Sequence, residues 1–322
     1  MGHFSYVGFG FAKARILGEY AVMYGAPGLV TALSPRCTVR VYDLPTDTDG
    51  AVTADSDGTR DAAWERALRE HLGIRACVSV ARDGFFDADG HKLGIGSSAA
   101  AAVGIVDAVR QLPDAVRRQA QFLTPPGPLF ATAIALHRET QGRMGSGIDV
   151  IASAMGGVVC ARGCPHDPVV RRVAPECLPR IAVLATRRPA PTADFLAAAR
   201  AAENTREYRT CIDALALAYA DLERCLDAPT KKRDFLDRIG ELPALLRRIG
   251  NAIGRPVVPP EFDAILPVAR ECGVVLKTSG AGGGDILLAM AEADDAIRDF
   301  CARLPEGIAP LPYPIAPERD LV

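Results

Sequence analysis

The segment that most constrains this chain is residues 92–102, KLGIGSSAAAA, where two glycines and two serines stand directly before four alanines. Gly94 and Gly96 allow the backbone to approach a ligand closely, and the alanines favour a helix with slim first turns. A helix leaves its first N–H groups unpaired and carries partial positive charge at that end, so anions bind there. The segment therefore predicts a phosphate-binding loop at a helix start.

Within that loop we expect Ser97 and Ser98 to cap the helix and to offer hydroxyls to phosphate oxygens, with Ser98 also a candidate magnesium ligand. Ala99 completes the expected nucleotide-binding set. The segment lacks the Walker pattern, and no GxGxxG follows a strand. Taken alone, it is equally consistent with a helix cap flanked by flexible glycines, so other segments must decide.

Composition narrows the class of protein. A chain of 322 residues with 49% hydrophobic residues favours two compact domains. A formal charge of −2 gives no electrostatic case for nucleic acid or an anionic membrane. No apolar run reaches the roughly 18 residues that span a bilayer, and the first residues resemble no secretory leader, so we expect a cytoplasmic protein.

The nine cysteines are scattered without a Cys-x-x-Cys pair, which favours reduced, buried thiols over disulfides. Cys160, Cys164 and His166 are the nearest approach to a metal cluster. Because no second ligand pair follows at suitable spacing, small apolar roles near a strand end are the better interpretation.

Hydrophobic periodicity predicts an α+β protein. Early strands are expected over residues 15–24, turning at 25–27, and over 37–44, and a loop or hairpin tip over 45–60. Helices are expected over 62–72, 98–112 and 128–140, with a short one over 149–155. The turn-rich residues 164–179 form the expected seam between domains 1–177 and 178–322. The second half then reads as strand 180–186, helices within 193–253, helix 261–271, strands 274–278 and 285–290, and helix 294–304.

Three further segments carry candidate chemistry. GRMGSGIDVIASAMGG (142–157) places Asp149 at a helix start, where an acidic residue is also an ordinary N-terminal feature. KTSGAGGGDILLAM (277–290) holds more glycines than a hairpin turn requires, so it can wrap over a ligand. AKARILGEYAVMYGAPGLV (12–30) places Lys13 in a strand, where a solvated edge charge is the alternative interpretation.

Together, Lys13 with GEYAVMYGAP, GIGSSAA, GSGIDV and SGAGGGD resemble the galactokinase, homoserine kinase, mevalonate kinase and phosphomevalonate kinase (GHMP) superfamily, over nearly the whole chain. GEY, the lysine before the loop (Lys92), HRETQGRMGSGID and TRRPAPT are similar to the phosphomevalonate kinase branch. The resemblance implies two domains, the first like ribosomal protein S5 domain 2 and the second ferredoxin-like. It also implies ATP and Mg²⁺ as cofactors and 5-phosphomevalonate as the acceptor, in a monomer or homodimer.

The resemblance further implies roles for single residues. Lys13 would stabilise the transferring phosphoryl group, and Asp149 would orient or deprotonate the acceptor. A nearby ammonium lowers the pKa of an aspartate and makes it a weaker base, and an acceptor phosphate is already largely ionised. A positioning and electrostatic role for the Lys13–Asp149 pair is therefore favoured over general-base catalysis. The expected substrate-binding set is Lys92, Arg143, Ser146, Thr192, Ser279 and Gly282, with Arg187, Arg188 and Lys277 as further bases beside the motifs.

The chain departs from the family pattern at two places. Gly10-Phe11-Ala12 replaces the usual Ala-Pro-Gly before the lysine, and His137 stands where mevalonate kinases carry a magnesium-binding glutamate, with Glu139 two residues on. We therefore assign no carboxylate ligand to magnesium. The alternatives are a mevalonate kinase, a kinase for another small molecule, and a regulatory protein that binds nucleotide without turnover.

Overall fold

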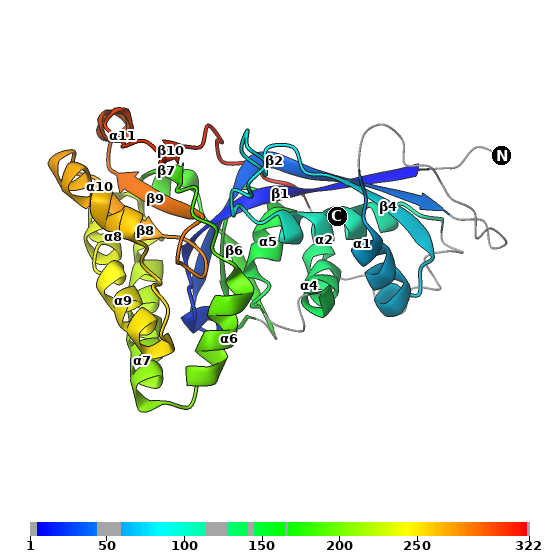
Figure 1. Ribbon diagram of the computed structural model, residues 1–322, viewed down its shortest axis with the longest axis horizontal. Helices are drawn as coiled ribbons and strands as arrows, with labels where there is room; N and C mark the ends of the chain where they lie inside the picture. Colours follow the sequence, from blue (N-terminus) through cyan, green and yellow to red (C-terminus); the bar gives the residue numbers. More distant parts are fainter. Residues whose placement is uncertain (1–4, 44–58, 114–127, 141–144, 165–166, 321–322) are drawn as a thin grey trace.

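The computed structural model describes residues 5–43, 59–113, 128–140, 145–164 and 167–320, and it contains two antiparallel sheets covered by helices (Figure 1). The first sheet holds β1 (Ser5–Leu17), β2 (Gly28–Asp43), β3 (Thr59–Arg60), β4 (Ala76–Ala81), β5 (Val158–Arg162) and β6 (Val169–Arg172). The second holds β7 (Arg180–Ala185), β8 (Val275–Thr278), β9 (Ile286–Ala291) and β10 (Ala309–Pro310). The expected α+β class is confirmed.

The long strand β2 organises the first sheet. It pairs with β1 along one edge, while its first residues pair with β5 and its last with β4 on the other edge. In this register Lys13 lies opposite Ala32. In Figure 1 the β1–β2 ribbon extends toward the second sheet.

Helices α2 (Ser97–Val109), α4 (Leu129–Thr140) and α5 (Ile148–Met155) lie on one face of that sheet (Figure 1). A Cβ built on Gly10 of β1 would lie 2.3 Å from the carbonyl oxygen of Ala100. Ala99, Ala100, Ala101 and Ala102 are all buried. The alanine run is therefore required for close packing of α2 on β1, where a larger side chain would push the layers apart.

The remaining helices lie beside the first or the second sheet. α1 (Ala62–Ala67) continues into a π-helical turn, Leu68–Leu72, beside β4. The second sheet is accompanied by α6 (Thr192–Ala202), α7 (Arg206–Cys225), α8 (Lys232–Ile239), α9 (Leu242–Ile253), α10 (Pro260–Glu271) and α11 (Asp294–Ala302). Short 3₁₀ turns cover Ala21–Tyr24, Pro175–Cys177 and Pro229–Lys231.

A buried ion pair joins the two halves of the molecule. Lys277 of β8 donates to the Glu19 carboxylate, and both side chains are 0% exposed. The Tyr219 hydroxyl of α7 donates to Glu19 Oε2 at 3.0 Å. Lys277 was expected among the bases beside the ligand, but its ammonium lies in this internal cluster instead.

The C-terminal segment returns across the first sheet. The Ala316 N–H donates to the Ala32 carbonyl at 3.0 Å, and the Arg319 N–H donates to the Met155 carbonyl at 2.8 Å. Arg319 also pairs with Asp107 of α2. The end of the chain therefore ties the second half back onto the first (Figure 1).

Two expected elements differ from the structure. The strand expected over 15–24 ends at Leu17, because Gly18 (φ +110°) and Tyr20 (φ +57°) adopt left-handed backbone and residues 21–24 form a 3₁₀ turn. The seam expected over 164–179 contains β6, whose residues pair with β5. The loop expected over 45–60 lies almost wholly outside the described residues, and the domain boundary after residue 177 stays a prediction.

All nine cysteines carry free thiols. Cys160 and Cys164 are buried and belong to no cluster of potential metal ligands within the described residues, and His166 lies outside them. Within the same described ranges, no helix is long and apolar enough to cross a bilayer.

Candidate active site

Three charged side chains meet where β1 approaches the start of α5. The Asp149 carboxylate lies between two cations, with Oδ2 3.5 Å from Lys13 Nζ and Oδ1 2.8 Å from Arg15 Nη2. The Arg15 Nε–H also donates to Asp149 Oδ1, at 3.3 Å. The expected Lys13–Asp149 pairing is therefore present, with an arginine as a third member.

Local structure explains how these side chains converge. Lys13 and Arg15 stand two residues apart in β1, and side chains at that spacing share one face of a strand. Gly147, at φ +78°, forms the N-cap of α5, and its missing side chain makes room for Ile134. Asp149 then lies in the first helical turn, where the helix dipole favours a carboxylate.

The electrostatic surroundings keep Asp149 ionised. Burial acts to raise the pKa of Asp149, but the positive charges of Arg15 and Lys13 and the Arg15 hydrogen bonds outweigh it, so the pKa lies well below its ordinary value. The pKa of Arg15 is raised, because its interactions with Asp149 outweigh the opposing effect of burial. An aspartate in this state is a weak proton acceptor at neutral pH.

The glycines of the 92–102 loop lie against charged side chains. A Cβ on Gly96, at φ +84°, would lie 2.6 Å from Lys13 Cε, and one on Gly94, at φ +72°, would lie 2.3 Å from Asp285 Cβ. The Lys13 N–H donates to the Ile95 carbonyl at 2.9 Å. The glycines therefore create the space in which Lys13 and Asp285 lie, and their contact with phosphate stays a prediction.

The expected serine caps are wrong, because α2 begins at Ser97 with Gly96 at the N-cap position and without a side-chain capping bond. Ser98 Oγ lies 3.1 Å from His137 Nε2. Burial lowers the pKa of His137, and the charge of Lys13 lowers it further, against the opposing effect of Asp149. A neutral His137 ring in the tautomer with an unprotonated Nε2 accepts the Ser98 hydroxyl hydrogen.

A cavity of about 370 Å³ opens beside the charged cluster. Both halves of the chain contribute to its wall, and α6 forms one side. The lining residues that bear on the chemistry are Lys13, Arg15, Tyr20, Gly94, His137, Ser146, Asp149, Thr192, Arg200, Ser279, Gly282 and Asp285. This size suits a small-molecule ligand.

The SGAGGGD loop is held to the GEY segment and to β1. The Tyr20 hydroxyl donates to the Ala281 carbonyl at 2.6 Å. The Arg15 N–H donates to Ser279 Oγ at 2.9 Å, and the Ser279 hydroxyl donates to the Arg15 carbonyl at 2.9 Å. The Ser279 hydroxyl, which was expected to bind the substrate, therefore donates its hydrogen to the Arg15 backbone and fixes the position of that arginine.

Gly282 and Asp285 shape the same loop. A Cβ on Gly282 would lie 2.3 Å from the Val257 carbonyl oxygen, so only glycine fits there. Asp285 Oδ1 accepts the Ala190 N–H at 3.1 Å. Burial raises the pKa of Asp285, although this hydrogen bond and the charges of Lys13 and Lys92 oppose the rise.

The other expected substrate residues lie in different settings. Ser146 is buried in the cavity wall, where its Oγ accepts the Ile148 N–H at 3.4 Å. Thr192 is exposed at the start of α6 and lines the cavity, whereas Lys92 is exposed and does not appear among the lining residues. Arg143 lies outside the described residues.

The arginines expected beside the site take other positions. Arg188 Nε donates to Glu261 at 2.8 Å on the surface, and Arg187 is exposed. Sequence reasoning did not single out Arg15 and Arg200, which line the cavity. The two-residue spacing from Lys13 was a signal for Arg15, whereas no local pattern distinguishes Arg200 from a solvated helix charge.

Comparison with known proteins agrees with this fold. The family described as GHMP kinases C terminal matches residues 233–306. A phosphomevalonate kinase from Streptomyces sp. (strain CL190) is 26% identical over 373 residues, covering 96% of this chain and 96% of that protein.

Solved structures share the fold. A protein from Listeria innocua has a TM-score of 0.76 at 18% identity, covering 98% of this chain and 99% of that chain. Streptococcus pneumoniae phosphomevalonate kinase in complex with phosphomevalonate and AMPPNP has a TM-score of 0.67 at 16% identity, covering 98% of this chain and all (100%) of that chain. The C-terminal family match and the full-length relative make this chain similar to the GHMP small-molecule kinases, and the solved structures share its fold.

Proposed function

We propose that the chain is an ATP-dependent kinase that converts 5-phosphomevalonate to 5-diphosphomevalonate. An oxygen of the acceptor phosphate forms a bond to the γ-phosphorus of ATP, the bond from that phosphorus to the β–γ bridging oxygen breaks, and ADP leaves. Such transfer depends mainly on alignment and on neutralising charge. Lys13 supplies positive charge to the transferring group, and Asp149 orients the ammonium of Lys13 beside it.

The observation that carries this proposal is the Asp149 carboxylate held between Lys13 and Arg15. An alcohol acceptor loses its proton during transfer and benefits from a general base. A phosphate acceptor is already largely ionised near neutral pH, because its second pKa is about 6. The lowered pKa of Asp149 makes it a poor base, which supports the phosphate acceptor over mevalonate.

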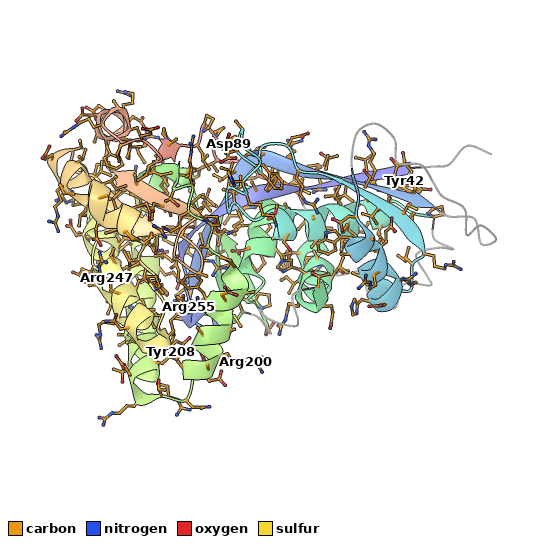
Figure 2. The ribbon with its side chains drawn as sticks, in the orientation of Figure 1. Tyr42, Asp89, Arg200, Tyr208, Arg247 and Arg255 are labelled. Atoms are coloured by element: carbon orange, nitrogen blue, oxygen red, sulfur yellow. The ribbon has the colours of Figure 1, made fainter. Side chains whose placement is uncertain are left out.

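The charges of the cavity wall support the same acceptor. 5-Phosphomevalonate carries a carboxylate as well as a phosphate. Arg200, on α6 (Figure 2), lines the cavity and makes no ion pair with any described residue. We propose that Arg200 binds the acceptor carboxylate while the cluster at Lys13 and Arg15 receives the phosphate.

ATP and magnesium fit the start of α2. The unpaired N–H groups there would bind nucleotide phosphates, beside Gly94 and Gly96. Ser98 would hold magnesium together with those phosphates, because its hydroxyl lies in the first turn of α2, beside His137. When bound, the metal neutralises phosphate charge.

An ADP-release assay with 5-phosphomevalonate, mevalonate, homoserine and galactose tests the proposal. We expect turnover with 5-phosphomevalonate and at most trace turnover with the other three. Asp149→Asn serves as the control that any observed ADP release comes from this site. Turnover with mevalonate and none with 5-phosphomevalonate would refute the proposed acceptor.

A further inference from the structure

The Arg15 guanidinium has unused hydrogen-bonding capacity. Two of its five N–H groups are directed to Asp149 Oδ1, from Nε and Nη2. The side chain is only 14% exposed, lines the cavity, and makes no other side-chain hydrogen bond within the described chain. A largely buried arginine with free donors on a cavity wall fits an anionic ligand.

Arg15 is also held in place from behind. Ser279 Oγ accepts its backbone N–H and donates to its backbone carbonyl, both at 2.9 Å. Its side chain is anchored by Asp149, which Lys13 approaches from the opposite carboxylate oxygen. The free edge of the guanidinium is thus fixed before any ligand arrives, which reduces the entropy lost on binding.

The planar fork of an arginine suits the geometry of phosphate, to which it donates two parallel hydrogen bonds. A neutral alcohol offers no comparable pair of acceptors. The carboxylate of Asp149 repels a second anion, so the net charge of the cluster matters. Lys13 and Arg15 leave one excess positive charge over Asp149. Asp285 adds a second carboxyl to the same cavity wall, and burial raises its pKa, which favours its neutral form.

We propose that Arg15 binds the phosphate of the acceptor while it anchors Asp149, and that it thereby selects phosphorylated acceptors over the corresponding alcohols. This inference rests on the proposed function for the choice of acceptor. A purely structural Arg15, which only neutralises Asp149, would affect both kinds of acceptor alike.

Isothermal titration calorimetry with AMPPNP at saturation tests the assignment. The titrants are 5-phosphomevalonate, mevalonate and inorganic phosphate, and the variants are Arg15→Met, Arg15→Lys and the surface control Arg233→Met. Among the described residues, Arg233 pairs with Asp237 and Glu292, at exposed positions. Thermal unfolding verifies that each variant is folded, and Arg15→Lys preserves the charge if Arg15→Met does not fold.

We expect Arg15→Met to weaken the binding of 5-phosphomevalonate and inorganic phosphate about tenfold or more. The binding of mevalonate should weaken by less than about threefold. Arg15→Lys should be intermediate, because it keeps charge but loses the fork. Unchanged binding of 5-phosphomevalonate, or an equal loss for all three titrants, would overturn the assignment.

The same titrations separate this inference from the proposed function. If the wild type binds mevalonate but not 5-phosphomevalonate, the proposed acceptor is wrong, and inorganic phosphate then decides the role of Arg15. Weaker phosphate binding in Arg15→Met would still support an anion site. Equal phosphate binding in the two proteins, or none in the wild type, would overturn it.

Discussion

Loss of the Lys277 ammonium should destabilise the fold strongly. Lys277 and Glu19 are both 0% exposed, so Lys277→Met leaves a buried carboxylate with the Tyr219 hydroxyl as its remaining side-chain partner among the described residues. Removing one partner of a buried ion pair costs about 3–5 kcal/mol. We therefore expect the free energy of unfolding to fall by about that amount.

The reverse substitution should be milder. Glu19→Gln keeps the shape of the side chain, and burial already lowers the pKa of Lys277, so the orphaned ammonium can lose its proton. The double variant Glu19→Gln/Lys277→Met removes both charges and should recover about half of the loss caused by Lys277→Met.

Urea denaturation of the wild type, both single variants and the double variant measures these values. Arg247→Met serves as the exposed control, since its pair with Asp263 is on the surface and should contribute about 0–1 kcal/mol. A loss below about 1 kcal/mol in Lys277→Met, or strict additivity in the double variant, would refute the reasoning.

Three further predictions concern the cavity. Gly96→Ala should lower kcat about tenfold or more, because its Cβ would lie 2.6 Å from Lys13 Cε; Gly254→Ala, also at positive φ but with open space around its Cβ, should leave kcat within about twofold. Arg200→Met should raise KM for 5-phosphomevalonate about tenfold while kcat stays within about threefold in steady-state assays. Burial raises the pKa of Asp149 less than its two cations lower it, so its contribution to stability is present above about pH 4 and is lost as pH falls through the folded pKa. Denaturation at about pH 5 and about pH 3 measures the free energy of unfolding at each pH. Between these pH values it should fall less for Asp149→Asn than for the wild type, and an equal fall would contradict this sign.

Much of the fold was predictable because hydrophobic periodicity is local. The helices at 97–109, 129–140 and 148–155, and the strands around the SGAGGGD loop, lie close to their expected positions. The strand end at Leu17 was missed because it depends on positive φ at Gly18 and Tyr20, which the hydrophobic pattern does not show. β6 was missed because its strand state comes from pairing with β5, a tertiary effect.

The site residues that belong to sequence motifs could be predicted, whereas those placed by tertiary contacts could not. Lys13 and Asp149 meet as the motifs predict. Arg15 was overlooked, although strand alternation placed it beside Lys13. The burial of Lys277 against Glu19 depends on residues 258 positions apart, which no local pattern reveals.

Steady-state kinetics of Asp149→Asn with ATP and 5-phosphomevalonate test the central claim most directly. If Asp149 orients Lys13 during transfer to an ionised acceptor, kcat should fall about 100-fold or more while KM changes by less than about threefold. Wild-type kcat in Asp149→Asn would contradict the account.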